Sequence, residues 1–436
     1  MQSMSILNIN DLALQLVALD FSDGHMPTNG GPTKTSRALA IIHLAAHDAY
    51  AKVTGKLTPR LSTLPTPPAM DNTEANGSAA LLCAGFRAAT LLYPDFKKFI
   101  AIEAAKVLNA DSDDLACKYG ERVADAWIAA RMNDGSSAPQ LDTLYNPAAG
   151  RHRPDPLDPK QQALGRNWGL VTPFAISSIP TDAFLKAPPL LNSPEYATAF
   201  NEVITDGKNH LPQLAPCKAV SGIFWGYDGS NKLGVPPRLY NQVVRAIEEF
   251  KVLTHDRQIK VLTAINVAMA DAGIAAWYWK YQYDVWRPVV GIREADRGWG
   301  PQGKGDDNPS TNGDPFWLPL GAPNSNSTKP NGTPGFPAYP SGHATFGAAC
   351  FKTAAELLGK KPAEITVKFV SDEFNGITTD NTGVIRPKYQ ATFNLCEAIT
   401  ENNQSRIYLG VHWQFDAIGG DTVGTEIATK VIAAFK

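Results

Sequence analysis

The sequence predicts an all-α fold built from paired helical bundles, with long irregular loops and little or no sheet. Alanine-rich segments, in which apolar residues recur every three or four positions, alternate with polar segments rich in proline and glycine. Runs with the pattern of a strand are few and short. The 436 residues, 44% of them hydrophobic, are enough for a large core and more than one helical unit. We expect one globular unit (1–436), with N-terminal helices and a proline- and glycine-rich loop in residues 1–190 and a C-terminal helical bundle in residues 191–436.

Helical patterning identifies the individual elements. Residues 36–52 are apolar on most faces, which indicates a buried helix. In residues 255–283, small and apolar side chains step by three and four positions from Leu262 to Ala276, a stripe that suits close helix packing. The segments predicted to be helical are residues 36–52, 75–92, 95–109, 113–132, 193–207, 237–250, 255–283, 344–358 and, as a final block, 389–435.

Two long segments, residues 133–189 and 297–340, are rich in proline and glycine and are predicted to be irregular. Irregular segments of this length inside a compact chain are usually functional lids or binding loops. We therefore expect a pocket at the end of the C-terminal bundle, roofed by residues 297–340.

The overall charge excludes some partners. With a net charge of -2, the chain has no general field that would attract nucleic acid or an anionic membrane. Any anion site must therefore come from a few placed cations. No uncharged apolar run approaches the ~20 residues that span a bilayer, and the first residues lack the pattern of a signal peptide. These features predict a soluble protein, either cytoplasmic or exported by another route.

The cysteine pattern predicts neither a disulfide framework nor a zinc site. The cysteines are odd in number, lie far apart and include no CxxC pair, so buried free thiols are the preferred interpretation. They are Cys83, Cys117, Cys217, Cys350 and Cys396.

A first motif, WYWKYQYDVWRP, occupies residues 277–288. Lys280 and Arg287 are seven positions apart, close to two helical turns, so on one helix both side chains would face the same side. Pro288 disfavours helical geometry at Arg287. We therefore expect the helix to end at Arg287, with the guanidinium group at the C-terminal end of the helix.

A second motif, FPAYPSGHATFG, occupies residues 336–347. Pro340 precedes Ser341, Gly342 and His343 and a new helix, so the backbone N–H groups of this turn are expected to be unpaired and to point outward. A helix N-terminus that contains a glycine is a favourable site for an anion.

A third motif, SRIYLGVHWQFDAIGGD, occupies residues 405–421. Gly410 is a natural helix stop after Arg406, and His412 is expected to open the next helix. Asp416 follows four positions later on the same face. It could therefore hold one ring nitrogen of His412 and leave the other free to bind a metal or to attack phosphorus.

These motifs, in this order and spacing, resemble the signature of the vanadium haloperoxidases within the type 2 phosphatidic acid phosphatase superfamily. The segments WGLVTPFA (168–175) and PPRLYNQ (236–242) resemble bacterial and fungal vanadium haloperoxidases more than the short acid phosphatases. The resemblance implies helical bundles of that type and one vanadate, as V(V), per chain. It also implies hydrogen peroxide, a halide ion and an organic acceptor as reactants. Related enzymes are often oligomers, so a homodimer or larger homo-oligomer is expected.

The resemblance also implies a role for each site residue. His412 would be the vanadium ligand, held by Asp416, and His343 would be the acid–base group, for which an ordinary pKa of about 6.5 is suitable. Lys280 would polarise the bound oxidant as well as hold vanadate. The residues implied to bind vanadate are Lys280, Arg287, Ser341, Gly342, Arg406 and His412.

Three further residues are implied or weighed around this set. Trp277 and Phe336 match positions near the halide, where Phe336 would make the halide site more apolar and less hydrated. For Trp277, a purely structural role as an aromatic residue of the core is an equally good interpretation. Asp228, in WGYDGS, is a candidate partner for Arg406, because arginines around an oxyanion need to be held in place.

Alternative interpretations remain at this stage. The leading hypothesis is a vanadate-dependent haloperoxidase. The same set of oxyanion-binding residues would serve an acid phosphatase that forms a phosphohistidine at His412. A non-catalytic oxyanion-binding protein is a third candidate. Elsewhere, His43, His47 and Asp48 have a spacing that zinc could use, but their apolar helix favours structural packing.

Overall fold

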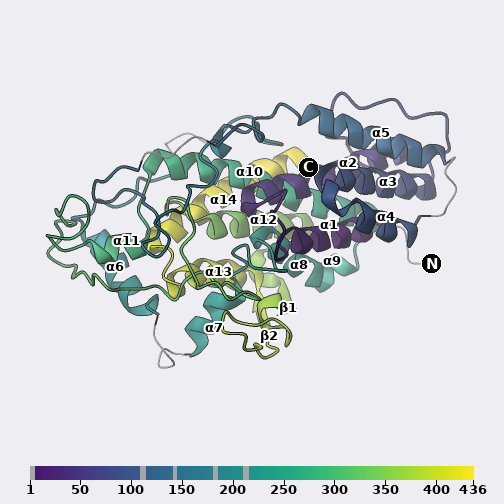
Figure 1. Cartoon of the computed structure of the whole chain (residues 1–436). Coiled ribbons are helices and arrows are strands. Elements are labelled where there is room, and N and C mark those ends of the chain that lie inside the picture. Colours follow the sequence, from purple (N-terminus) through teal and green to yellow (C-terminus); the bar gives the residue numbers. More distant parts are fainter. Residues whose placement is uncertain (1–4, 109–113, 141–144, 180–184, 210–215) are drawn as a thin grey trace.

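The computed structural model describes residues 5–108, 114–140, 145–179, 185–209 and 216–436. Helices dominate these residues, and two strands form a small antiparallel sheet (Figure 1), which confirms the predicted all-α class. The α-helices are α1 (Ile6–Asp20), α2 (Gly31–Thr54), α3 (Glu74–Leu92), α4 (Lys97–Ala105), α5 (Leu115–Ala130), α6 (Pro194–Asp206), α7 (Pro216–Phe224), α8 (Pro236–Ala246), α9 (Glu248–Lys251), α10 (His255–Tyr283), α11 (Pro288–Arg293), α12 (Gly342–Leu358), α13 (Leu395–Tyr408) and α14 (Gln414–Phe435). The 3-10 helices are η1 (Pro94–Phe96), η2 (Trp168–Leu170), η3 (Pro362–Glu364) and η4 (Asp372–Phe374), and the strands are β1 (Thr366–Val370) and β2 (Gln390–Asn394).

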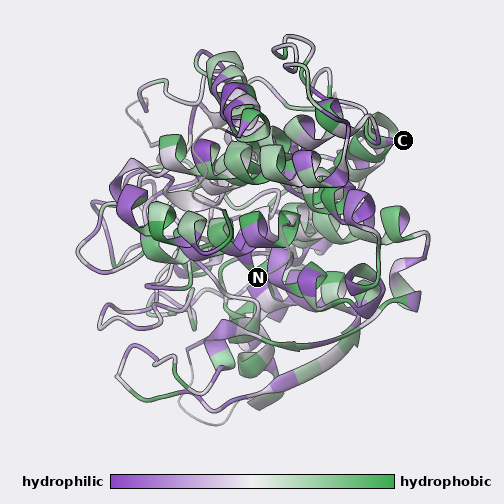
Figure 2. Cartoon of the chain, turned by 90° about the vertical axis from the view of Figure 1, so that its right-hand side faces the viewer, coloured by the Kyte–Doolittle hydropathy of each residue, from purple (hydrophilic) through white to green (hydrophobic). Residues whose placement is uncertain are grey.

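The long helix α10 connects two groups of helices. Helices α2, α3 and α5 pack together at one end of the molecule, and α12 packs against α13 and α14 in its middle (Figure 1). Helix α10 contacts both α2 and α12. It is also long and apolar enough to cross a membrane, but 94% of its most apolar window is buried inside the chain, so it is a core helix. Most helices carry both hydrophobic and hydrophilic residues, as expected when one side is buried (Figure 2).

Local sequence signals explain the helix ends nearest the site. Ser341 is the N-cap of α12, and its side chain accepts a hydrogen bond from the Ala344 amide. Helix α13 starts at a capping box between Asn394 and Glu397 and ends before Gly410, which has a φ of 69°. A Cβ at Gly420 would lie 2.5 Å from the Ser341 carbonyl oxygen, so glycine is needed where α14 crosses the start of α12.

Several predicted boundaries differ from the structure. The block 389–435 begins with a strand, which was not predicted, whereas its division into two helices agrees with the helix stop predicted at Gly410. Helix α10 has the bounds predicted from its apolar pattern, 255–283, but the separate expectation from Pro288 that it would run on to Arg287 is wrong, because Asp284 adopts a left-handed conformation. Helices α1, α7 and α11 and both strands were not predicted. The predicted end at residue 109 and start at residue 113 lie outside the described residues.

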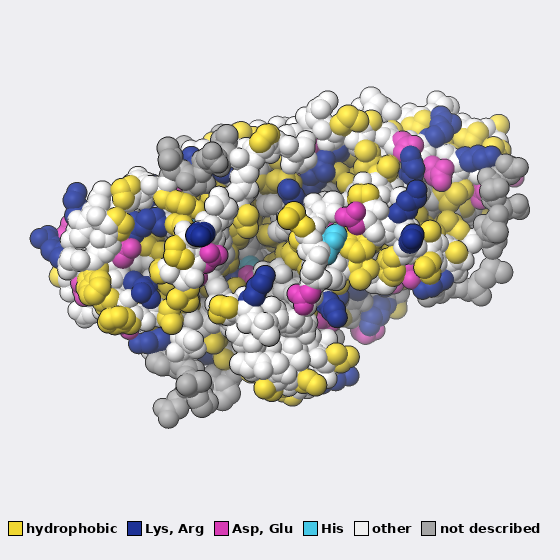
Figure 3. Space-filling view, in the orientation of Figure 1, with side chains coloured by type: hydrophobic (Ala, Val, Ile, Leu, Met, Phe, Trp, Pro, Cys, Tyr) yellow, Lys and Arg dark blue, Asp and Glu magenta, His cyan; other side chains and the backbone are white. Residues whose placement is uncertain are grey.

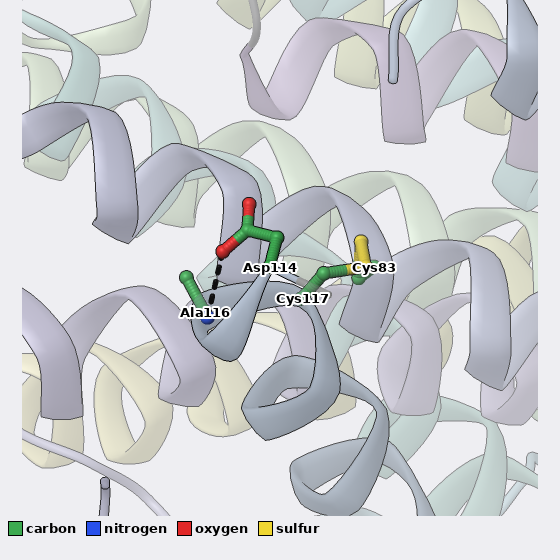
Figure 4. The surroundings of a disulfide bond; sticks show 4 residues. All are labelled: Cys83, Asp114, Ala116 and Cys117. Carbon is green, nitrogen blue, oxygen red and sulfur yellow. Dashed lines mark hydrogen bonds between the residues drawn. A yellow bond between two sulfur atoms is a disulfide. The ribbon is translucent and has the colours of Figure 1, made fainter. Parts of the chain in front are cut away.

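The prediction that all cysteines are free thiols is wrong. Cys83 of α3 and Cys117 of α5 form a disulfide (Figure 4). The two helices pack side by side, which brings residues 34 positions apart to a Cα–Cα distance of 5.1 Å. Closing a loop of this length restricts the unfolded chain and stabilises the fold by about 3–4 kcal/mol. Of the other cysteines, Cys350 is buried, whereas Cys217 and Cys396 are exposed.

The HxxxHD segment of α2 makes hydrogen bonds inside the core. The His43 Nδ1–H donates to the Leu39 carbonyl, and His43 Nε2 accepts from Asn10. The His47 Nδ1 lies 2.8 Å from a carboxylate oxygen of Asp48. These contacts agree with the structural-packing interpretation.

Candidate active site

The three motifs meet at one cavity of about 580 Å³. Gly342 and His343 reach its wall from the start of α12, Arg406 reaches it from the last turn of α13, and His412 reaches it from the loop before α14. Residues 322–324 and 329–336 of the predicted roof also line the cavity. Figure 3 shows that one face of the molecule is hollowed near its middle and carries positive and negative side chains interspersed.

Two of the cations, Lys280 and Arg287, are held by backbone carbonyls. Both side chains are almost completely buried. The Lys280 ammonium donates to the carbonyls of residues 337 and 338 at 2.8 and 3.1 Å. Arg287 donates from Nε to the Phe336 carbonyl at 2.9 Å and from Nη1 to the Val411 carbonyl at 2.7 Å. Both cations also lie about 5 Å from the centre of the Phe336 ring, at 5.1 and 5.0 Å.

The route by which Lys280 and Arg287 converge differs from the predicted one. Arg287 is extended and lies outside α10, as the N-cap of α11. The two side chains meet because the chain turns at Asp284 and returns beside residues 336–338. Burial lowers the pKa of Lys280 well below its usual range, and the charge of Arg287 adds to the effect. Burial likewise lowers the pKa of Arg287 to about 9.

The third cation, Arg406, is held by a carboxylate. Its two terminal nitrogens donate to Asp228 at 2.7 and 2.9 Å, in the bidentate geometry that makes such pairs strong. Arg406 is fully buried. The pairing suggested from the sequence is therefore present in the structure.

Lys280, Arg287 and Arg406, together with His412 and the start of α12, are called the cage from here on. Two hydrogen-bond donors of this cage have no partner. Arg287 Nη2 and Arg406 Nε are buried and make no hydrogen bond within the described part of the chain. Leaving a buried donor unpaired costs about 1–3 kcal/mol, and more when the group is charged. Such a cost is offset when an anionic guest supplies the missing acceptors.

The hydrogen bonds of His412 define its protonation. Arg287 Nη1 lies 2.9 Å from His412 Nε2, and because an arginine only donates, Nε2 must be the acceptor nitrogen. Nδ1 then carries the proton and donates to Asp416 Oδ2 at 2.9 Å. Burial lowers the pKa of His412 well below its usual range and raises the pKa of Asp416 to about 7. A neutral ring is the form that binds a metal, through its unprotonated nitrogen, which is here Nε2. In this structure Nε2 accepts from Arg287, and a metal bound there would take the place of that hydrogen bond.

The turn before α12 supplies the remaining polar groups. The sequence predicted a free Ser341 amide. In the structure this amide donates to the Asp416 carbonyl at 2.8 Å. Gly342 and His343 lie in the first turn of α12, where amides have no acceptor within the helix. A side chain at Gly342 would place its Cβ 3.3 Å from the Trp277 ring, so glycine keeps the backbone close to the aromatic wall.

His343 is held by a backbone carbonyl. Its Nε2–H donates to Gly226 at 2.7 Å and lies 3.9 Å from Asp228. Burial lowers the pKa of His343 to about 3, and the charge of Arg406 contributes, which differs from the ordinary value expected from the sequence. The hydrogen bond at Nε2 leaves Nδ1 as the acceptor nitrogen of the ring.

Sequence reasoning missed the residues that hold the His343 backbone. The Asn402 amide donates to the His343 carbonyl at 2.9 Å, and the Tyr240 hydroxyl donates to Asn402 at 2.8 Å. Tyr240 lies within the PPRLYNQ segment, which was noted only as context. Nothing in the local sequence distinguishes Asn402 from other polar helix residues.

Comparison with known proteins decides the family. Residues 260–436 match the model of the VCPO second helical-bundle domain. A vanadium chloroperoxidase of Curvularia inaequalis is 30% identical over 520 residues, covering 98% of this chain and 81% of that protein. The chain belongs to the vanadium-dependent haloperoxidases. This family membership favours the peroxidase hypothesis over the phosphatase and the non-catalytic binding protein.

Solved structures support the fold of this haloperoxidase. A bacterial vanadium-dependent iodoperoxidase matches with a TM-score of 0.73 and 20% identity, over 99% of this chain and 96% of that one. A bacterial vanadium-dependent chloroperoxidase in its apo form matches with a TM-score of 0.67 and 17% identity, over 93% and 94% of the two chains. At these identities the likeness shows the fold alone.

The residues of this haloperoxidase fit an oxyanion such as vanadate. Arg406, the first turn of α12 and His412 line the cavity, and Arg287, which carries the other unpaired donor, contacts His412 and Phe336 of that lining. Guanidinium groups match the oxygens of tetrahedral anions in geometry and charge. The donor set therefore suits both the oxygens and the central atom of such a guest.

Proposed function

We propose that this haloperoxidase binds one vanadate per chain in the cage described above and uses hydrogen peroxide to oxidise halide. The observation that carries the proposal is the pair of unpaired buried donors, Arg287 Nη2 and Arg406 Nε, beside the acceptor nitrogen of His412. The residues proposed to hold vanadate are Lys280, Arg287, Ser341, Gly342, Arg406 and His412, with His412 as the vanadium ligand.

Bound vanadate supplies a Lewis acid that activates hydrogen peroxide for the two-electron oxidation of a halide ion. The chain contributes charge, orientation and proton movement. Lys280 and the two arginines balance the charge of the anion, while Asp228 keeps Arg406 in place. Asp416 fixes the orientation and tautomer of His412.

His343 is the proposed acid–base residue. Its hydrogen bond to Gly226 fixes the ring and leaves Nδ1 as the proton acceptor. Because the charge of Arg406 contributes to the low pKa of His343, an anion bound beside Arg406 raises that pKa toward the range needed for proton transfer.

The halide is proposed to approach the corner formed by Trp277 and Phe336. Their rings lie 4.8 Å apart and both line the cavity. Phe336 contacts Lys280 and Arg287, so an apolar surface lies directly beside two positive charges. A weakly hydrated anion is suited to such a corner, because it gives up little hydration and gains two attractive charges.

The deciding experiment supplies vanadate-free protein with orthovanadate, hydrogen peroxide and iodide, bromide or chloride, and follows halogenation of a dye. We expect vanadate-dependent turnover with at least one halide. His412→Ala should abolish vanadate retention in equilibrium dialysis. Turnover of a chromogenic phosphate ester without oxidation of any halide would contradict the proposal, as would undiminished vanadate binding by His412→Ala.

Two properties of the whole protein remain predictions. The Cys83–Cys117 disulfide favours an oxidising compartment, and therefore export, over the cytoplasm. Thiol labelling of the protein taken directly from its native source would test this. A homodimer or larger homo-oligomer is also still predicted, and native mass spectrometry would measure it.

A further inference from the structure

The cavity is much larger than the proposed reaction centre requires. Its volume is about 580 Å³. Vanadate, peroxide and a halide together are about the size of six to eight water molecules, or roughly 200 Å³ at ~30 Å³ each. More than half of the cavity therefore lies outside the cage, and its full size is in the range of pockets for small organic molecules.

Three aromatic side chains line the cavity next to the cage, and we call them the aromatic floor. Trp277 lies 4.8 Å from Phe336 and 6.2 Å from Phe346, measured between ring centres, and all three line the cavity. Aromatic side chains favour flat aromatic guests through offset or edge-to-face contacts. The floor adjoins Gly342 and Lys280, so a ring lying on it would be next to the cage.

Two half-exposed leucines line the outer part of the cavity. Leu157 and Leu164 are 55% and 49% exposed. Their segment is fixed to the roof, because the Leu164 amide donates to the Gly335 carbonyl and Gln161 donates to the Thr333 carbonyl. The Leu164 carbonyl also accepts from the indole of Trp277 at 3.1 Å. The wall is therefore preformed.

The charges that line the outer part of the cavity favour a neutral guest. Asp158 and Lys329 both line the cavity and are exposed. They are of opposite sign, and Asp228 is already neutralised by Arg406. Asp155, the remaining carboxylate of the lining, is buried and accepts from the Leu157 and Thr333 amides. A guest between the leucines and the aromatic floor therefore meets mainly apolar surface, and the lining offers no excess of positive charge that would favour an anion.

We propose that the outer cavity is a binding site for a flat, neutral, electron-rich aromatic acceptor, which is halogenated before hypohalous acid leaves. The inference rests on the proposed haloperoxidase function. In the transfer step, a ring carbon forms a bond to the halogen of hypohalous acid as the halogen–oxygen bond breaks. The displaced ring proton and the hydroxide form water. The overall reaction consumes one halide, one hydrogen peroxide and one proton per halogenated ring and gives two waters.

A binding measurement tests the site without catalysis. The probe is 2-naphthol, in equilibrium dialysis against vanadate-free protein. Leu164→Glu, and separately Leu157→Glu, places a charge in the apolar wall. The matched control is Leu115→Glu, which changes a leucine of similar exposure, 51%, at the start of α5 and outside the cavity. We expect wild type and Leu115→Glu to bind equally, and Leu164→Glu to bind at least tenfold more weakly. Equal binding by wild type and Leu164→Glu, or no saturable binding by wild type, would overturn the proposal.

A competition measurement tests the same site during turnover. Wild-type enzyme, bromide and peroxide act on a mixture of 2-naphthol and 4-hydroxybenzenesulfonate, and reagent hypobromite on the same mixture gives the reference product ratio. We expect the enzyme to favour the naphthol product at least fivefold over the reference, and Leu164→Glu to return the ratio toward it. An enzyme ratio equal to that of the reagent would mean that free hypobromite does the chemistry, and would overturn the proposal. Absence of peroxide-dependent triiodide formation would instead contradict the proposed function, while naphthol binding would still report on the site.

Discussion

Replacing Arg287 by lysine removes the hydrogen-bonding fork of the cage but keeps its charge. Arg287 uses Nε and Nη1 for the carbonyls of Phe336 and Val411, and Nη2 is left without a partner in the described part of the chain. A lysine ammonium is a point charge that cannot reproduce this planar arrangement. The substitution therefore separates hydrogen-bond geometry from simple charge balance.

The expected loss of affinity for orthovanadate follows from the number of hydrogen bonds that the substitution removes. Arg287 Nη2 is available for one charge-assisted hydrogen bond to a bound oxyanion. Such a bond contributes about 1.5–3 kcal/mol. Since each 1.4 kcal/mol is about a factor of ten in Kd, Arg287→Lys should weaken orthovanadate binding about 10–150-fold.

The assay is equilibrium dialysis of orthovanadate against vanadate-free protein, accompanied by thermal unfolding to check that the variant is folded. The matched control is Arg297→Lys, which changes an arginine whose side chain is 82% exposed and pairs with Asp307. The control should bind vanadate like wild type. A folded Arg287→Lys protein with wild-type affinity would show that charge alone holds the anion, and would refute the role given to the unpaired donor.

Three further outcomes are expected. Lys280→Ala should retain orthovanadate, since two arginines still face it, but lose halide oxidation, as dialysis and a dye-halogenation assay on the same sample would show. The double variant Cys83→Ser/Cys117→Ser should unfold in urea with a free energy about 3–4 kcal/mol lower than wild type; an unchanged midpoint would mean that the disulfide contributes nothing. Burial lowers the pKa of His43 from 6.5 to about 4, so the unfolded chain takes up a proton at a higher pH than the folded chain does. The free energy of unfolding should therefore fall as the pH drops from about 6.5 to 4, by at most about 1.4 kcal/mol per pH unit. Denaturant titrations of wild type and His43→Gln would test this, because the variant should have the shallower pH dependence.

Periodic segments were the most predictable part of the fold. Residues 255–283 form α10 with the predicted bounds, because a long apolar pattern specifies a buried helix by itself. The block 389–435 was less predictable. Its strand pairs with residues 366–370, a distant partner that local patterning does not reveal.

The site was predictable as a set but not in its detail. The order and spacing of the motifs indicated that Lys280, His343 and His412 belong together, and the structure brings their segments to one cavity. The path of the chain was not predictable, since the turn at Asp284 depends on one left-handed residue. The Cys83–Cys117 pair likewise depends on how two helices pack, which spacing along the sequence does not encode.

The contacts of the two buried cations constrain how reactants reach the cage. Lys280 and Arg287 together donate three hydrogen bonds to the carbonyls of residues 336–338. Lifting this part of the roof would leave buried charges without acceptors, at a cost of about 1–3 kcal/mol or more for each bond. The same bonds hold the cations in position before an anion arrives, which is the condition for strong electrostatic stabilisation. An organic acceptor bound against the half-exposed Leu157 and Leu164 would therefore lie beside a roof segment that is held in place before the acceptor arrives.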